Sequence, residues 1–274
     1  MPPWCILLGD AEHEPLFGGK AVSLGAAIRA GLPVPGGVAL ASPLVDRIAE
    51  GDAAALEKLE AFAHLLEGRL AVRSSAVGED SAGASFAGQH QTVLNVRRAG
   101  IQSAVVTVRD SGRSAAALAY RKKQGLTMEA AVGVVVQRLI EPLAAGVLFT
   151  RHPITGSRER LIEAAWGLGE VVVSGAVTPD SFRVSTAGQL LEATPGHKDI
   201  RVWWADHGHG TDTHPLPEDD HARLCLDDGH LAALHELAAR CEALYGPDLD
   251  LEWAVDATGA VHLLQARPIT AGAR

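Results

Sequence analysis

The segment Asp248-Leu249-Asp250-Leu251-Glu252-Trp253-Ala254-Val255 is followed, after a short gap, by Val261-His262-Leu263-Leu264-Gln265-Ala266-Arg267-Pro268. Both segments alternate as β-strands do, so together they predict a β-hairpin whose loop runs from Asp256 to Gly259. With that loop, Val255 faces Ala260, Glu252 faces Leu263, and Asp250 faces Gln265.

This predicted hairpin has two chemically different faces, because successive side chains of a strand point to opposite sides. One face carries Asp250, Glu252, Gln265 and Arg267. Carboxylate and amide oxygens are ligands that Mg²⁺ accepts, and a neighbouring arginine suits a phosphate group. The pattern therefore predicts a magnesium and phosphate site, with the solvated face of an edge hairpin as the alternative. The opposite face is mostly apolar and is expected to pack on a core: Leu251, Trp253, Val255, His262, Leu264 and Ala266.

The bulk composition is that of a globular chain. The 274 residues, 47% of them hydrophobic and 21% charged, allow one large domain or two lobes. A net charge of −9 argues against a nonspecific nucleic-acid surface or an anionic-membrane surface. The sequence shows no membrane-spanning apolar run and no signal peptide, and its three cysteines are widely spaced. We therefore expect a cytoplasmic chain without a disulfide framework or structural zinc site.

Strand and helix signals are mixed along the chain, which predicts an α+β or α/β fold with two lobes and a cleft. The stretch 205–222 holds His207, His209, His214 and His221 and is expected to be a solvated loop, with a metal site as the alternative. The predicted helices cover 18–31, 46–66, 101–120 and 229–245, the last with Leu231, Leu234, Leu237, Cys241 and Leu244 as its buried stripe. The predicted strands cover 36–41, 70–72, 91–96, 132–139, 146–150, 161–164, and a hairpin of 182–184 with 189–191.

Two segments in the first half have the residue types of a phosphate site. Gly18-Gly19-Lys20 opens a predicted helix, whose N-terminus favours an anion, and the lysine adds a positive charge. Arg73 leaves a predicted strand and enters a loop of small residues that reaches Gly88, and Thr92 follows it. Gly88 permits close backbone approach and Thr92 offers a hydroxyl group. A glycine turn with a surface lysine, and an ordinary surface loop, are the alternatives.

Further candidates lie beside the central strands. Gln137 ends an apolar strand, where a polar side chain suits an adenine edge or simply terminates the strand. Arg151 is a second phosphate ligand candidate, and Glu163 and Glu170 are candidate loop or metal-proximal acids. Gly167-Leu168-Gly169 has the composition of a hinge, and each of these residues also has a purely structural alternative.

Five short motifs occur in a characteristic order: Gly-Gly-Lys, Arg-Ser-Ser-Ala, Phe-Thr-Arg-x-Pro, Trp-Gly-Leu-Gly-Glu and Leu-Gln-Ala-Arg-Pro. From Phe17 to Thr270 the chain resembles the N-terminal nucleotide-binding domain shared by phosphoenolpyruvate synthase, pyruvate phosphate dikinase and rifampin phosphotransferase. The resemblance implies an ATP-grasp-like α+β architecture, in which two lobes clamp a nucleotide cleft. Residues 1–127 would form the N-terminal lobe, trimmed between Lys20 and Arg73, and residues 128–274 the C-terminal lobe with the metal-binding hairpin.

The same resemblance implies roles for individual residues. ATP would be contacted by Lys20, Arg73, Gly88, Thr92 and Gln137. Asp250, Glu252 and Gln265 would sit at the metal and triphosphate, with Glu252 and Gln265 as ligands of Mg²⁺. Lys20, Arg73, Arg151 and Arg267 would be the catalytic cations, the last two neutralising phosphate charge during transfer.

Relatives with a full set of domains carry a phospho-acceptor histidine in a Thr-Ser-His-Ala-type motif, and this sequence has no such motif. The leading hypothesis is a dikinase-type phosphotransferase component of a split enzyme. It would cleave Mg·ATP towards AMP and phosphate and phosphorylate a histidine on a separate swivelling domain or protein, which serves a small-molecule acceptor. An excised domain of a longer chain fits equally. A stand-alone ATP-grasp kinase or ligase, acting directly on a small-molecule or carboxylate acceptor, is the first alternative. A non-catalytic nucleotide-sensing module is the second.

Overall fold

The computed structural model describes residues 4–77, 91–114, 131–205 and 208–269. The chain forms two units, each with its own antiparallel sheet. Unit 1 comprises Met1–Arg29, Pro35–Leu139 and Trp204–Gly210, and unit 2 comprises Ala30–Val34, Ile140–Trp203 and Thr211–Arg274. The expected boundary after residue 127 differs from this division, because strand β5 (Val132–Arg138) pairs with strands of unit 1.

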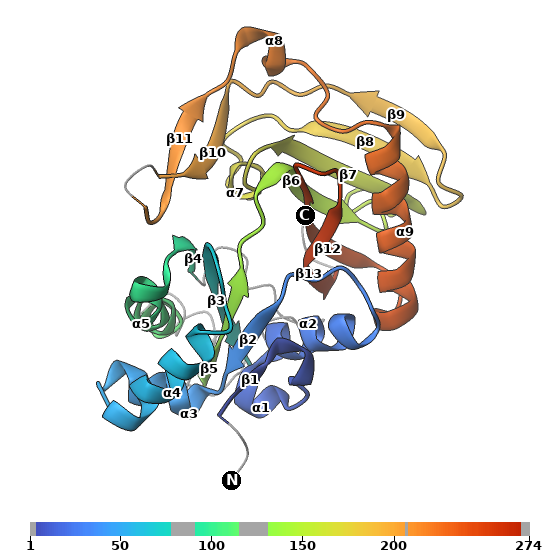
Figure 1. The fold of residues 1–274 in the computed structure, drawn as a ribbon. Coiled ribbons are helices and arrows are strands. Elements are labelled where there is room, and N and C mark those ends of the chain that lie inside the picture. Colours follow the sequence, from blue (N-terminus) through green and yellow to red (C-terminus); the bar gives the residue numbers. More distant parts are fainter. Residues whose placement is uncertain (1–3, 78–90, 115–130, 206–207, 270–274) are drawn as a thin grey trace. The chain divides into compact units, whose positions relative to one another are not determined.

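Unit 1 is built on a five-stranded sheet in the order β1-β2-β5-β3-β4, with every neighbouring pair antiparallel (Figure 1). The central strand β5 is the valine-rich run that the sequence marked most strongly, and its residues Val132 to Gln137 are all buried. The other strands are β1 (Cys5–Leu7), β2 (Gly37–Leu40), β3 (Leu70–Ala76) and β4 (Thr92–Val96).

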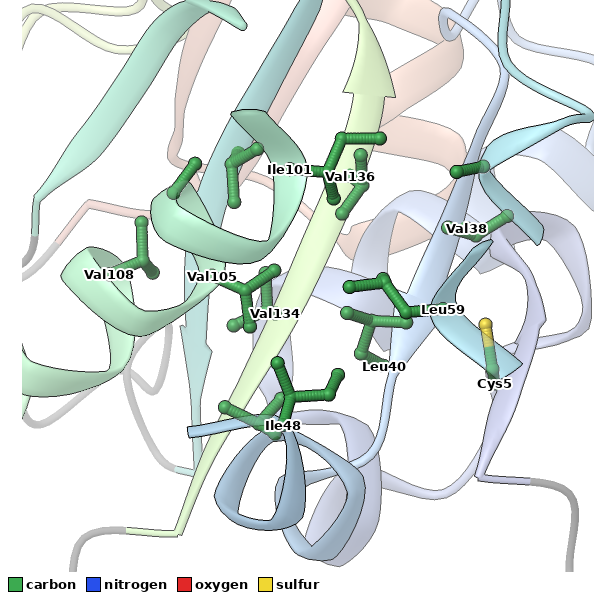
Figure 2. Packing of buried hydrophobic residues seen from close by; sticks show 14 of the residues in the cluster. Cys5, Val38, Leu40, Ile48, Leu59, Ile101, Val105, Val108, Val134 and Val136 are labelled. Carbon is green, nitrogen blue, oxygen red and sulfur yellow. The ribbon is translucent and has the colours of Figure 1, made fainter. Parts of the chain in front are cut away.

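The main core of unit 1 lies on one face of this sheet. Val134 and Val136 of β5 pack there with helix residues such as Ile48, Val105 and Val108 (Figure 2). These side chains come from α3 (Ser42–Ala49) and α5 (Ile101–Ser111), and α4 (Ala53–Ala63) adds Leu59. The remaining helical segments of unit 1 are η1 (Leu8–Asp10), α1 (Glu14–Phe17), α2 (Gly19–Arg29) and η2 (Arg98–Gly100).

The single helix expected over 46–66 is two helices, α3 and α4. Gly51 adopts a φ of 76°, a left-handed conformation that interrupts the first helix. Asp52 then caps the second, because its carboxylate accepts a hydrogen bond of 2.8 Å from the backbone N–H of Ala55. The helix expected over 101–120 is described only as α5, since 115–120 lie outside the described residues.

Unit 2 contains a six-stranded antiparallel sheet in the order β13-β12-β6-β7-β8-β9. Helix α9 (Asp228–Tyr245) packs against β12 and β13, and Asp227 caps its N-terminus. Leu231, Leu234, Leu237 and Cys241 are buried as predicted, but Leu244 is 38% exposed, so its predicted place in the buried stripe is wrong. The strands are β6 (Pro142–Phe149), β7 (Glu159–Trp166), β8 (Asp180–Ser185), β9 (Leu190–Thr194), β12 (Leu249–Asp256) and β13 (Val261–Pro268).

The loop expected over 205–222 contains regular structure. Its strand β11 (Thr211–Pro215) pairs with β10 (Ile200–Trp204), and α8 (Glu218–His221) follows. Strand β11 is short and polar, so its pattern resembled a loop. Helix α7 (Glu170–Val173) completes the elements of unit 2. Within the described part of the chain, no helix combines the length and apolar character needed to cross a membrane.

The predicted hairpin is present, but its register differs from the expected one. Val255 pairs with Val261, Glu252 with Gln265, and Asp250 with Arg267. The turn is one residue longer than predicted, and the pairing shifts again between Glu252 and Trp253, where it skips Leu264. Because the total shift at Asp250 is two residues, the four polar side chains still share one face. Leu263, expected opposite Glu252, pairs instead with Trp253 and is fully buried.

Candidate functional site

In unit 1, three of the predicted nucleotide residues lie on one face of the sheet. Arg73 pairs directly with Thr92 of β4 and with Val135 of β5, so these side chains point to the same side. Gln137, two residues beyond Val135, shares that side. This face is opposite the one that carries the core residues Val134 and Val136. The structure thus groups Arg73, Thr92 and Gln137 across three adjacent strands.

The start of helix α2 is fixed against β3 on the same face. Gly18 has a φ of 81°, and a Cβ atom there would lie 1.7 Å from the backbone oxygen of Ser75. The Ser75 hydroxyl accepts a hydrogen bond of 2.9 Å from the N–H of Ala21. Lys20 lies between these two contact points in the sequence and is 5% exposed. Only glycine at position 18 allows this approach, which places Lys20 beside the segment that contains Arg73.

The structure refines two expectations for unit 1 and does not test a third. Arg73 is 8% exposed and lies inside β3, which runs to Ala76, and not in a loop that leaves the strand. The Gln137 side chain, 2% exposed, donates a hydrogen bond of 2.9 Å to the backbone oxygen of Pro35. Its amide nitrogen therefore joins β5 to the segment before β2, a structural role that the strand-end pattern allowed. Gly88 lies outside the described residues.

In unit 2, the paired strands β12 and β13 bring a carboxylate and a guanidinium together. Arg267 donates from Nε and Nη2 to Oδ2 of Asp250, at 2.8 and 2.7 Å. The other oxygen, Oδ1, is buried and has no hydrogen-bond partner among the described residues. Burial raises the pKa of the Asp250 carboxyl, while the charge of Arg267 acts in the opposite direction. A buried oxygen left open in this way is suited to a cation or a donor that binds from outside.

Glu252 and Gln265 form the adjacent pair on the same face. Gln265 is 6% exposed, and Glu252 is half-buried. No group of three or more His, Cys, Asp or Glu residues within the described ranges could enclose a metal ion. Mg²⁺ in phosphate sites usually keeps several waters and takes one or two carboxylates plus phosphate oxygens. An open oxygen of Asp250, a carboxylate and an amide on one face meet that smaller requirement.

Arg151 lies at the same end of the sheet as Arg267. Strand β6 ends at Phe149, which pairs with Asp250, and Arg151 follows two residues later. Its Nη1 contacts Oδ2 of Asp248 at 3.2 Å, and its Nε donates to the backbone oxygen of Gly156 at 2.8 Å. The sequence analysis did not predict a role for Asp248, which binds Arg151. Its position between the helix-ending Gly246-Pro247 and the polar strand could have indicated one.

The two acidic candidates of unit 2 have different surroundings. Glu163 lies on β7, paired with Val147 of β6. Glu170 accepts a hydrogen bond of 3.1 Å from the hydroxyl of Thr211, which joins α7 to β11. Burial raises the pKa of both carboxyl groups; the charge of His152 opposes it at Glu163, and the bond from Thr211 opposes it at Glu170.

Known proteins resemble this chain over most of its length. Residues 40–274 match the family described as "Pyruvate phosphate dikinase, AMP/ATP-binding domain". A probable phosphoenolpyruvate synthase of Methanothermobacter thermautotrophicus is 43% identical over 73% of this chain and 29% of its own length. A rifampicin phosphotransferase of a Streptomyces species is 39% identical over 84% of this chain and 26% of its own length. The chain thus spans less than a third of either relative. The solved VanG D-Ala:D-Ser ligase of Enterococcus faecalis is a distant structural neighbour: the match covers 94% of this chain and 55% of the ligase chain, at 13% identity and a TM-score of 0.45.

Proposed function

Because this chain belongs to the family of the pyruvate phosphate dikinase AMP/ATP-binding domain, we propose that it binds Mg·ATP and drives phosphoryl transfer to a histidine. The histidine belongs to a separate swivelling domain or protein, which passes the phosphoryl group to a small-molecule acceptor. The ATP-grasp architecture is part of this proposal. The observation that carries it is the shared face of Asp250, Glu252, Gln265 and Arg267 in unit 2.

Unit 1 contributes cations and a hydroxyl group to the nucleotide. Lys20, at the start of α2, and Arg73, in β3, are both largely buried within one small region. A buried cation interacts more strongly with phosphate than an exposed one, because less water screens it. Thr92 pairs with Arg73 and adds a hydroxyl group on the same face. We assign these three residues to phosphate binding, and the Gln137 region to the adenine.

Unit 2 contributes the magnesium ligands. Glu252 and Gln265 would bind the ion directly, and the open Oδ1 of Asp250 would face the metal–triphosphate group. When bound, Mg²⁺ neutralises charge on the phosphate oxygens and holds them in a reactive geometry. Gln265 is a neutral ligand, so the site brings fewer negative charges to the triphosphate than three carboxylates would.

The arginines supply the charge that phosphoryl transfer needs. Arg267 and Arg151 are each held by an aspartate, Asp250 and Asp248 respectively. A guanidinium fixed in this way needs little reorganisation when charge develops on the transferred group. The net reaction is balanced as ATP, water and histidine giving AMP, inorganic phosphate and phosphohistidine.

The product of ATP cleavage tests this proposal. Purified chain, Mg·ATP and a separate protein with a Thr-Ser-His-Ala-type segment should yield AMP and an acid-labile phosphohistidine on that protein. The same mixture with the acceptor histidine replaced by alanine should yield neither. ADP formed with a small-molecule acceptor and no histidine protein would overturn the relay in favour of direct transfer.

A further inference from the structure

Glu163 occupies the same cross-strand row as the proposed magnesium ligands. Gln265 pairs with Glu252, Glu252 with Val147, and Val147 with Glu163, through the neighbouring strands β13, β12, β6 and β7. Residues paired in this way point to one face of the sheet. Glu163 therefore lies on the face of Glu252 and Gln265, separated from Glu252 by one strand.

The neighbours of Glu163 along its own strand are apolar. Its neighbours on the same face of β7 are Leu161, which is 8% exposed, and Ala165, which is fully buried. Among the residues that the structure describes, none donates a hydrogen bond to the Glu163 carboxylate. Burial raises the pKa of this group. The charge of His152 acts in the opposite direction. A half-buried carboxylate that accepts no hydrogen bond from the described residues still destabilises a fold, so a role outside folding would explain its presence.

The spacing of the strands sets how far Glu163 lies from the proposed magnesium ligands. Neighbouring strands lie about 4.8 Å apart, so the Cα atoms of Glu252 and Glu163 are roughly 10 Å apart. A direct bond from a carboxylate oxygen to Mg²⁺ is only about 2.1 Å long, and the ion usually keeps several waters. Glu252 and Gln265 are direct neighbours and Glu163 lies one strand beyond them, so an ion on that pair would turn its remaining waters toward Glu163.

We propose that Glu163 is an outer residue of the magnesium–triphosphate site, accepting hydrogen bonds from water bound to an ion on Glu252 and Gln265. This rests on the proposed function. A second observation on the same face supports a cation there: Asp250 is 8% exposed, and its Oδ1 has no partner among the described residues. Glu163 is thus a positioning residue, which acts on the substrate through the hydrated ion.

Calorimetric titration of the full chain with a non-hydrolysable ATP analogue tests this role. The variant is Glu163→Gln, which keeps the shape and removes the charge. The matched control is Glu192→Gln, a carboxylate of the same sheet that pairs with Arg183. Each titration is run in EDTA and at increasing magnesium concentration.

In EDTA, we expect Glu163→Gln to bind the analogue with the affinity of the wild type. Magnesium should then increase the affinity of the variant about tenfold less than it increases that of the wild type. Glu192→Gln should retain the full gain. An unchanged gain in Glu163→Gln, or an equal loss with and without magnesium, would overturn the inference. A wild-type chain without any magnesium-dependent binding would instead overturn the proposed function.

The thermal melting temperature separates this role from a structural one. Without nucleotide and metal, Glu163→Gln should melt at the wild-type temperature or above it, because a half-buried charge that accepts no hydrogen bond from the described residues is gone. A clear fall in melting temperature would show that Glu163 supports the fold and would contradict the proposed role.

Discussion

Arg267 illustrates how a single residue is prepared for phosphoryl transfer. Two of its N–H groups are occupied by one oxygen of Asp250, which fixes the plane of the guanidinium. Arg73 reaches a similar state by burial inside β3. Both side chains thus offer a positive charge that has already lost much of its conformational freedom. Removing either one removes electrostatic stabilisation that water cannot replace equally well.

Arg73→Ala and Arg267→Ala should each lower the rate of ATP cleavage by a factor of roughly 10²–10⁴. The measurement is steady-state release of AMP in the presence of the histidine protein. Arg97→Ala, which removes an exposed arginine of unit 1, is the control and should stay near wild type. Activity within threefold of wild type in either of the first two variants would contradict the assignment.

At the scale of the element, the β12–β13 hairpin depends on its turn. Oδ1 of Asp256 accepts hydrogen bonds from the backbone of Thr258 and Ala260, at 2.9 and 3.0 Å, and Oδ2 contacts His262 at 2.8 Å. Burial alone would raise the pKa of Asp256, but the bonds from Thr258, His262 and Ala260 hold it well below its usual range. The ionised carboxylate thus closes the turn that sets the strand register.

Asp256→Ala should lower the free energy of unfolding by about 1–3 kcal/mol at neutral pH, because several turn hydrogen bonds are lost. A lowered pKa means that the stabilisation is full above the unfolded-state pKa of about 4 and disappears as the pH falls further. Urea denaturation at neutral and acidic pH measures both effects. Thr258→Ala, which removes only a hydroxyl donor, should cost less. A difference between wild type and Asp256→Ala that persists unchanged below pH 3 would contradict this account.

A buried ion pair ties β8 to two other segments of unit 2. Asp180 and Lys198 are fully buried and in contact. The same carboxylate accepts hydrogen bonds of 2.8 Å from the backbone N–H groups of Gly196 and Cys225. The pair therefore joins the start of β8 to the segments that lead into β10 and α9.

Asp180→Ala should lower the free energy of unfolding by about 3–5 kcal/mol, because it leaves the charge of Lys198 buried without its partner. Denaturation of the double variant Asp180→Ala/Lys198→Met tests whether the unpaired charge of Lys198 causes this loss of stability. That variant should lose less stability than the sum of the two single substitutions. Asp199→Ala, an exposed neighbour, should be near neutral. Strict additivity in the double variant would contradict the explanation.

The sequence predicted most elements, and its failures have physical causes. Strand β5 and helix α9 have strong local patterns, valine-rich and amphipathic, so both were predicted closely. The split between α3 and α4 depends on one left-handed glycine, and the polar strand β11 owes its structure to pairing with β10. The hairpin register depends on a bulge that no local pattern announces. Pairing between strands distant in the sequence thus could not be predicted from local patterns.

At the scale of the whole molecule, the candidate residues of each unit lie on one face of an antiparallel sheet. Antiparallel pairing aligns polar side chains on one sheet face, Arg73 with Thr92 in unit 1 and Asp250 with Arg267 in unit 2. The period-two alternation predicted the second group directly. In unit 1 the residue types indicated two separate phosphate segments, and the family resemblance implied that they act on one nucleotide. The packing of Gly18 on Ser75, which brings Lys20 near the strand of Arg73, has no local pattern in the sequence. The roles of both groups in binding ATP stay predictions.

Calorimetric titration of the whole chain with the ATP analogue, with and without Mg²⁺, tests the central claim most directly. The wild type should bind the analogue with a large dependence on the ion, and Glu252→Gln should lose that dependence while Glu192→Gln keeps it. Nucleotide uptake that ignores magnesium, or that is unchanged in Glu252→Gln, would contradict the claim that the β12–β13 hairpin holds the metal.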